Sequence, residues 1–313
     1  MTAILATMRR IPLSVPVMRG NEAAYLKECI DTNWVSYVGP FVARFESEFA
    51  VAVGAPQAVA MNSGTAALHI ALLAAGVGAG DLVIMPDLTF IAPANAVRYC
   101  GADPVFVDVT ADRWQLDVEK VAAFLAQECE RTASQLRDRV TKRRIAALLP
   151  VHLLGHPVDL DPLMAIAAEY GLPVVEDATE SLGSTYKGRA PGTFGLAGCF
   201  SFNGNKIITS GGGGMLTTAS PDAARLSRYL STQARDDKLE YVHSAVGFNY
   251  RLTNLQAAVG VAQLEQLADH VERKRAIAAR YAAAVSLPSS VDLTDGDQDR
   301  VIAAVRRSLV SPA

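Results

Sequence analysis

Paired cysteines, long hydrophobic runs and an excess of one charge are all missing from this sequence. The four cysteines stand singly and without CxxC spacing, at Cys29, Cys100, Cys129 and Cys199. This spacing argues against a zinc site and against a disulfide framework. We therefore expect reduced thiols and no metal centre.

Charge is sparse and evenly spread along the chain. Charged residues make up 19% of the 313 residues, and the net charge is −3, so the basic footprint of a nucleic-acid-binding protein is missing. The apolar stretches are too short for a bilayer span, and residues 1–16 lack the apolar run of a signal peptide. We expect a cytoplasmic protein with neither nucleic acid nor a membrane as a partner.

The sequence does contain a regular alternation of short apolar runs with helical patterns. Half of the residues are hydrophobic, which fits a packed globular enzyme. The predicted strands are the apolar runs at 58–61, 81–86, 104–109, 145–151, 173–178, 198–202 and 214–218. Because helical segments separate them, the pattern predicts an α/β fold with a mainly parallel seven-stranded sheet flanked by helices.

Beyond residue 218 the pattern becomes helical. Residues 252–285 carry apolar side chains at mixed spacings of three and four, which predicts one long helix that packs against the rest of the chain. We therefore expect a large α/β domain over residues 1–250. A smaller element, made of the long helix and the C-terminal residues, is expected over residues 251–313.

Three segments of the large domain carry residues suited to chemistry, and the first runs from Asn62 to Thr65. It lies between a predicted strand and a predicted helix. The N–H groups at the helix start, with the hydroxyls of Ser63 and Thr65, would bind an anion such as a phosphate. An ordinary N-cap beside a glycine turn explains the same residues, so both interpretations stand at this point.

The second segment is the apolar run at 173–178, which carries Asp177 near its end. In an open α/β sheet the carboxyl ends of the strands face the ligand crevice. A carboxylate there would pair with a protonated pyridine nitrogen, which makes such a ring an electron sink. An aspartate that caps the next turn is an equal alternative.

The third segment places Lys206 after a buried strand and before the glycine run Gly211 to Gly214. Apolar and glycine neighbours, rather than acidic partners, favour a lysine pKa lowered by desolvation. A neutral amine is the form that makes an imine. Exposed lysines are more common, but a glycine run lets a ligand approach the backbone closely and so favours a functional lysine.

Taken together and in this order, the three segments resemble the DegT/StrS family of pyridoxal 5′-phosphate (PLP)-dependent sugar aminotransferases, of fold type I. The resemblance implies that Lys206 is the Schiff-base lysine and that Asp177 pairs with the pyridinium nitrogen. Phe90 matches the aromatic residue that stacks on the cofactor ring. The phosphate ligands that the resemblance implies are Ser63, Gly64, Thr65 and Ser201.

Two further parts of the resemblance concern the neighbouring subunit and the cofactor oxygen. Residues 247–258 match the family segment that reaches into the other subunit's site. The resemblance thus implies a homodimer in which Asn249 of the partner subunit contacts the phosphate, with Arg251 nearby as a substrate residue. Glu180 stands where many relatives have a glutamine near the phenolic oxygen, and we expect it to fill that role.

Three motifs bear on the substrate, at residues 11–16, 31–36 and 89–95, and they resemble the LegC-like subgroup. This implies a UDP-linked 4-keto-6-deoxy sugar as acceptor and glutamate as donor, in nonulosonic acid or surface polysaccharide biosynthesis. Compared with the family, much of the small C-terminal domain before the last helix at 297–309 is missing. Since that domain helps to close the site over the sugar, the alternative is a PLP- or sugar-nucleotide-binding homologue without turnover that acts as a partner or regulatory subunit.

Overall fold

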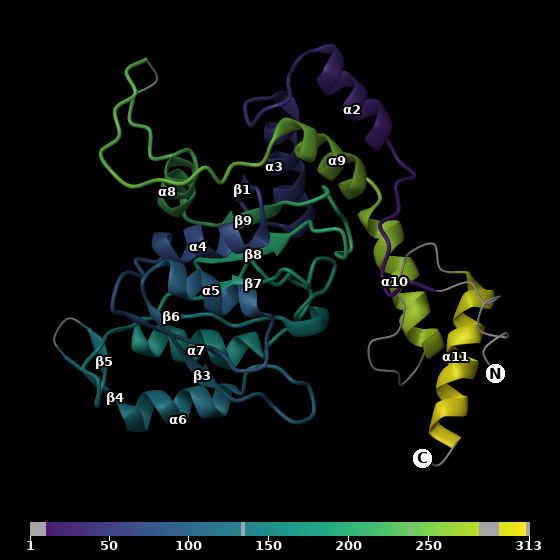
Figure 1. The fold of residues 1–313 in the computed structure, drawn as a ribbon. Coiled ribbons are helices and arrows are strands. Elements are labelled where there is room, and N and C mark those ends of the chain that lie inside the picture. Colours follow the sequence, from purple (N-terminus) through teal and green to yellow (C-terminus); the bar gives the residue numbers. More distant parts are fainter. Residues whose placement is uncertain (1–10, 133–134, 238, 282–293, 311–313) are drawn as a thin grey trace, which may run out of the picture.

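A computed structural model describes residues 11–132, 135–237, 239–281 and 294–310. The seven predicted apolar runs form strands in one layer (Figure 1). Their bounds are β1 Gln57–Met61, β2 Leu82–Pro86, β3 Asp103–Val107, β6 Ile145–Leu148, β7 Val175–Asp177, β8 Ala197–Ser201 and β9 Gly214–Thr218. The seven-stranded layer predicted from the sequence is confirmed.

Strand pairing makes this layer a mainly parallel sheet. Ladders join β1, β9, β8 and β7 in one group and β3, β2 and β6 in another. Parallel bridges from Leu148 to Val174 and from Val151 to Asp177 connect the two groups. Only β9 among these strands runs antiparallel to its neighbours. The carboxyl ends of β1, β7 and β8 therefore lie at the same edge of the sheet.

Helices cover both faces of the sheet, as the alternating side chains of β2 show. Val83 and Met85 join the core under α4 and α5, whereas Leu82 and Ile84 join the core under α6 and α7. A third core lies between the sheet and α3 and α9. The helices are α2 Glu22–Asp31, α3 Pro40–Val53, α4 Gly64–Ala74, α5 Ile91–Tyr99, α6 Val118–Glu128, α7 Leu160–Tyr170, α8 Pro221–Ser231 and α9 Asn254–Leu264. Burial on both faces of β2 explains its unbroken apolar sequence.

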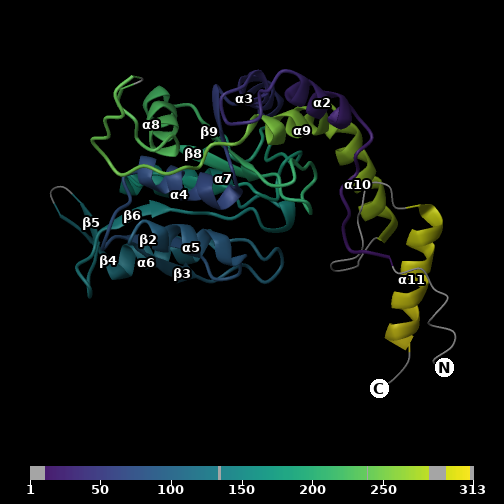
Figure 2. The ribbon, with the colours of Figure 1, turned by 45° about the horizontal axis from the view of Figure 1, so that its top comes forward.

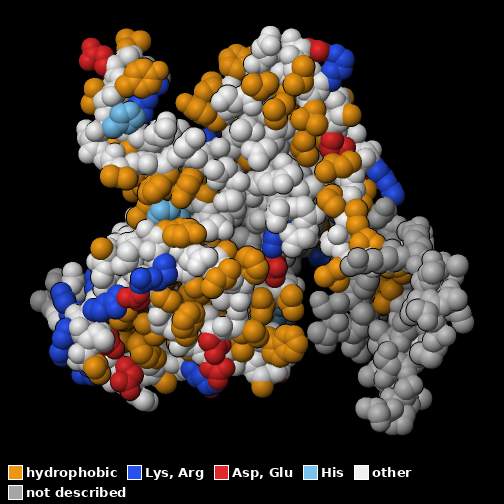
Figure 3. All heavy atoms as spheres, in the orientation of Figure 1, with side chains coloured by type: hydrophobic (Ala, Val, Ile, Leu, Met, Phe, Trp, Pro, Cys, Tyr) orange, Lys and Arg blue, Asp and Glu red, His pale blue; other side chains and the backbone are white. Residues whose placement is uncertain are grey.

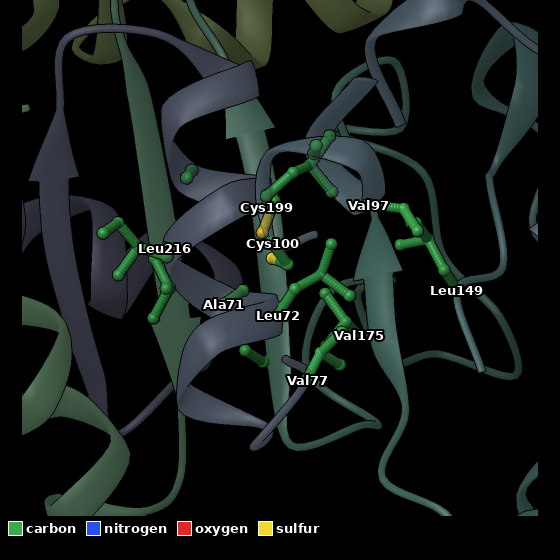
Figure 4. Close-up of a cluster of buried hydrophobic side chains, with 14 of the residues drawn as sticks. Ala71, Leu72, Val77, Val97, Cys100, Leu149, Val175, Cys199 and Leu216 are labelled. Carbon is green, nitrogen blue, oxygen red and sulfur yellow. The ribbon is translucent and has the colours of Figure 1, made fainter. Parts of the chain in front are cut away.

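The core between α4, α5 and the sheet holds two of the four cysteines (Figure 4). Cys199 of β8 and Cys100 at the end of α5 lie among aliphatic side chains such as Leu72 and Leu216. Burial raises the pKa of the Cys100 thiol to about 12. All four cysteines are free and buried, so they act as small apolar side chains here.

The single long helix predicted over residues 252–285 is wrong, because the chain forms two helices there. α9 ends at Leu264 and α10 covers Leu267–Tyr281. The apolar pattern runs through this break because Glu265 keeps nearly helical angles, φ −56° and ψ −24°. α9 packs in a core with α2 and α3, whereas α10 leads away from this core and α11 (Asp295–Val310) lies beside α10 at the outside of the molecule (Figures 1 and 2).

Other elements have no clear signal in the sequence. The helices α2 and α3 precede the first predicted strand, and a small hairpin pairs β4 (Cys129–Arg131) with β5 (Leu136–Asp138). Residues 282–293, which include the predicted shortening of the C-terminal domain, lie outside the described residues, and the domain boundary at residue 250 stays a prediction. Within the described part of the chain, no helix is long and apolar enough to cross a membrane.

Candidate active site

One cavity of about 590 Å³ collects most of the residues singled out in the sequence. We call it the Lys206 cavity. Of the predicted site residues, its lining includes Ser63, Gly64, Thr65, Phe90, Asp177, Glu180, Ser201 and Lys206. Most of these residues come from the carboxyl ends of β1, β7 and β8 and from the segments after them, which is where open α/β sheets bind ligands.

The start of α4 forms one wall of the Lys206 cavity. Ser63 is the N-cap: its Oγ accepts the N–H of Ala66 at 3.0 Å, and its carbonyl accepts that of Ala67 at 3.1 Å. The first two helical residues, Gly64 and Thr65, present their N–H groups beyond the helix end. The N-cap interpretation is thus confirmed, and the same geometry also provides donors for an anion.

Close packing at this helix start requires glycine. A Cβ on Gly64 would lie 2.9 Å from Ser201 Cβ and 3.1 Å from Thr179 Cγ2. Behind the loop, a Cβ on Gly214 would lie 2.4 Å from the carbonyl oxygen of Ser63. The backbone of this segment is therefore held at a fixed distance from Ser201 across the cavity wall.

Asp177 forms the floor of the cavity at the end of β7. Its N–H donates to Pro150 O at 2.9 Å, its carbonyl accepts the N–H of His152 at 3.0 Å, and its Oδ1 accepts the N–H of Thr179 at 3.0 Å. The residue is only 3% exposed, and this burial raises the pKa of its carboxyl group. A cationic group in the cavity would stabilise the ionised carboxylate.

The preceding residue, Glu176, points to the other side of the strand and anchors two loops. Its carboxylate lies 3.1 Å from Nε2 of His152 and accepts the N–H groups of Gly192, Phe194 and Gly195, each at 2.7 Å. Although burial opposes ionisation, these partners hold the pKa of Glu176 below its ordinary value. The alternation of the strand thus assigns Glu176 to structure and Asp177 to the cavity.

Lys206 lies against an acidic partner, which corrects the expectation that it has none. Its Nζ donates to Glu180 Oε1 at 3.2 Å, and Glu180 Oε2 accepts the N–H of Leu154 at 2.9 Å. The lysine side chain is 17% exposed. The partner lies 26 residues earlier in the chain and reaches Lys206 because the segments after β7 and β8 meet at one edge of the sheet.

Phe90 stands at the mouth of the cavity, at the N-cap of α5, and is 74% exposed. Its neighbour Thr89 also lines the cavity, and Thr89 Oγ1 is buried with no hydrogen-bond partner among the described residues. Buried polar groups in proteins are normally paired. An unpaired hydroxyl beside an open cavity therefore indicates a position for a polar ligand.

Asn249 and Arg251 do not line the Lys206 cavity of their own subunit. Arg251 donates to Ala60 O at 2.9 Å and to Glu46 Oε1 at 2.8 Å, and the side chains of this ion pair are largely buried. The carbonyl of Asn249 accepts Nδ2 of Asn62 at 3.3 Å. In its own chain, Arg251 ties β1 to α3. A role for these two residues in a partner's site stays a prediction.

The match to known proteins fits this geometry. The model of the DegT/DnrJ/EryC1/StrS aminotransferase family covers residues 16–284. The chain belongs to this family. Its relatives include GDP-perosamine synthase of Caulobacter vibrioides, which is 44% identical over 277 residues, 88% of this chain and 70% of that protein. The putative pyridoxal phosphate-dependent aminotransferase EpsN of Bacillus subtilis is 43% identical over 87% of this chain and 68% of its own.

Solved structures share this fold. DesV of S. venezuelae, in complex with a ketimine intermediate, superposes with a TM-score of 0.82 at 28% identity, over 94% of this chain and 95% of that chain. The predicted family and the fold type I architecture are confirmed. Enzymes of this family are PLP-dependent aminotransferases.

The described residues fit PLP as a cofactor. The cavity offers a lysine amine, a buried carboxylate and a helix start, which suit the aldehyde, the pyridine nitrogen and the phosphate respectively. The unpaired Thr89 Oγ1 and the glycine-only packing at Gly64 are the features of a preformed polar site. No cluster of His, Cys, Asp and Glu that could hold a metal ion occurs in the described part of the chain.

Sequence reasoning missed several residues of the Lys206 cavity, and Thr179 and Leu154 are two of them. Thr179 lines it and donates its N–H to Asp177, and its position two residues after the aspartate was a usable signal, since such short Asp turns are common. Leu154 also lines the cavity and adopts φ 55°, in the left-handed region. A leucine seldom adopts this conformation, so the sequence held no sign of it.

Proposed function

We propose that this family member transfers an amino group from glutamate to a nucleotide-linked 4-keto-6-deoxy sugar, with PLP as cofactor, in surface polysaccharide biosynthesis. One observation carries the proposal. Lys206, Asp177 and the N-terminus of α4 line the same cavity, and each suits a different part of PLP. The family match and the aminotransferases among the relatives support the reaction type.

The residues of the Lys206 cavity would hold the ring of the cofactor in a fixed position. Asp177 would accept the pyridine N–H, and its ionised form would gain the cationic partner that burial denies it. The N–H groups of Gly64 and Thr65 and the Ser201 hydroxyl would hold the phosphate. Phe90 would cover one face of the ring. When bound, PLP supplies the electron sink that transamination needs.

Lys206 would be the catalytic base. Its amine would take the proton from the α-carbon of glutamate and return a proton to the sugar carbon that receives nitrogen. The carboxylate of Glu180, at 3.2 Å from Nζ, would hold this amine within the cavity while it is not bonded to the cofactor. Donor and acceptor would then use one cavity in turn, which gives ping-pong kinetics.

GDP is the nucleotide that the relatives favour. Proteins named GDP-perosamine synthase from Caulobacter vibrioides and Escherichia coli O157:H7 are 44% and 40% identical to this chain. We therefore propose a GDP-linked sugar in place of the UDP-linked sugar expected from the LegC-like resemblance. The two nucleotides differ in their base, so the return half-reaction distinguishes them directly.

We also propose a homodimer, on the basis of exposed apolar side chains at the mouth of the cavity and on the loop after α8. Phe90 and Ile91 are 74% and 61% exposed, and Leu239, Tyr241 and Val246 of the loop after α8 are 80% exposed or more. Figure 3 shows hydrophobic side chains on this projecting loop and on the body beneath it. Large exposed apolar side chains that cluster on a surface are typical of an interface. A second copy would bring Asn249 of the partner subunit towards the phosphate.

The two half-reactions test the proposal separately. Glutamate should convert the PLP form to the pyridoxamine form, and a GDP-linked 4-keto-6-deoxy sugar should convert it back, with both steps followed by absorbance. UDP-linked 4-keto sugars serve as the comparison, and a response to them alone would replace GDP with UDP. A protein that binds PLP but converts it with neither glutamate nor any keto sugar would be a binding homologue without turnover, and the aminotransferase proposal would be wrong.

A further inference from the structure

A second cavity, of about 480 Å³, adjoins the Lys206 cavity. We call it the α10 cavity because one of its walls comes from α10. Both cavities are lined by Leu154, Thr179, Glu180, Ser201, Asn205 and Lys206. A ligand in the α10 cavity would therefore lie next to the amine of Lys206.

Two basic residues of α10, Lys274 and Arg275, line this cavity. Arg275 Nη2 donates to Gly183 O at 3.2 Å, and among the residues that the structure describes no carboxylate pairs with it. Burial lowers the pKa of the Lys274 ammonium, because a charged amine loses hydration there. Among the described residues that line the cavity, Glu180 is the single acidic one, so the cavity is suited to an anion.

The other basic residues of α10 face elsewhere. Arg273 and Arg280 pair with Asp295 of α11, at 3.7 and 3.3 Å, and Arg280 also pairs with Asp299 at 2.7 Å. The helix thus has two basic residues that pair with α11 and two others that line the cavity.

Contacts with the loops that carry Glu180 and Lys206 fix α10 in place. His270 Nδ1 lies 3.2 Å from the carbonyl oxygen of Ile207, directly after Lys206. Val271 packs so closely on Gly183 that a Cβ there would lie 2.4 Å from Val271 Cγ2. The cations of α10 are therefore held at a set position relative to the amine of Lys206.

We propose that Lys274 and Arg275 bind the diphosphate of the nucleotide sugar in the α10 cavity. This inference rests on the proposed function. A diphosphate offers adjacent anionic groups, which a guanidinium binds through paired hydrogen bonds and an ammonium binds as a point charge. With the diphosphate in the α10 cavity, the attached sugar extends towards Lys206, past the residues that line both cavities. Glutamate, which has two carboxylates, is the competing anion, and the experiment separates it from the diphosphate.

The test measures binding of GDP to the PLP-loaded protein by calorimetry, in wild type and in the double variant Lys274→Gln/Arg275→Gln. Loss of two charge-assisted contacts should weaken GDP binding by about tenfold or more. Arg280→Gln is the matched control, since it removes the same charge from the same helix outside the cavity and should bind GDP as wild type does. Lys274→Arg/Arg275→Lys keeps both charges and should restore most of the affinity.

The half-reactions distinguish the possible failures. The rate with glutamate should change less than about twofold in the double variant, while a higher GDP-sugar concentration should be needed for the return step. Unchanged GDP affinity, or a loss confined to glutamate, would overturn the diphosphate assignment. A double variant that no longer takes up PLP is replaced by the single variants, each of which should weaken GDP binding. If wild type itself fails to react with glutamate, the proposed function is wrong, whether or not GDP binds at α10.

Discussion

Asp177 combines burial with a charge that the proposed reaction requires. The raised pKa of its carboxyl group means that the cofactor-free chain holds this proton more tightly when folded than when unfolded. Stability therefore falls as the pH rises from the ordinary pKa of 3.8 through the raised value. The residue weakens the fold so that a cation can bind, which is common at functional sites.

Replacement of Asp177 by asparagine should separate these two effects. The cofactor-free Asp177→Asn protein should melt at a higher temperature than wild type at about pH 7, because no buried charge remains, and the difference should vanish at about pH 3. Its affinity for PLP should fall. Thermal unfolding across this pH range, with and without PLP, measures both. A wild type that is more stable than the variant at neutral pH without PLP would contradict the assignment.

Glu176 shows the opposite behaviour one residue earlier. Its carboxylate is fully buried and has four hydrogen-bond partners, so Glu176→Ala should cost about 3–5 kcal/mol of unfolding free energy. The control is Glu48→Ala, since Glu48 forms an exposed pair with Arg44 and should cost less than about 1 kcal/mol. Denaturant unfolding compares them. Equal losses would show that the buried network adds nothing.

Some residues of the site could be predicted from the sequence, and others could not. Asp177 and Lys206 could be placed because strand ends in an open sheet converge on one crevice. The contact of Lys206 with Glu180 and that of Arg251 with Glu46 could not, because both depend on tertiary packing between distant segments. The position of Lys274 and Arg275 at the α10 cavity could not be predicted for the same reason, because the sequence pattern of this helix shows only that it is amphipathic.

Among the elements, the start of α4 is the part of the site with the least tolerance for change. Gly64→Ala should weaken PLP binding by about tenfold or more, since its Cβ would meet Ser201 at 2.9 Å and displace the first turn of the helix. Gly78→Ala is the control, because its nearest neighbour is Asp81 Oδ2 at 3.9 Å. Titration with PLP compares the two. Equal affinities would show that the start of α4 does not bind the phosphate.

Elements with a clear apolar pattern could be predicted from the sequence, and elements without one could not. The seven strands could be predicted because each is a short apolar run, and helical segments separate the first five of them, β1, β2, β3, β6 and β7. The hairpin of β4 and β5 could not, because its strands have three residues each and contain Glu130, Arg131 and Arg137. The break after α9 left no trace in the sequence, since the backbone at Glu265 stays nearly helical.

At the scale of the whole molecule, the proposed dimer should depend on the loop that projects after α8. Tyr241 is 80% exposed, and Tyr241→Asp should weaken association by about tenfold or more if it is a central contact. Val140→Asp is the control, because Val140 is equally exposed at the small hairpin. Sedimentation measures both. A wild type that sediments as a monomer, or a variant that associates as wild type does, would contradict this interface.

The most direct test of the site concerns the bond between the cofactor and the chain. Borohydride reduction of the PLP-loaded protein, followed by digestion and mass spectrometry, should place the cofactor on the peptide that contains Lys206, and Lys206→Ala should remain unlabelled. The nearby Lys274 should carry no label in either protein. Label on Lys274 or another lysine, or none on wild type, would show that Lys206 is not the cofactor-binding lysine.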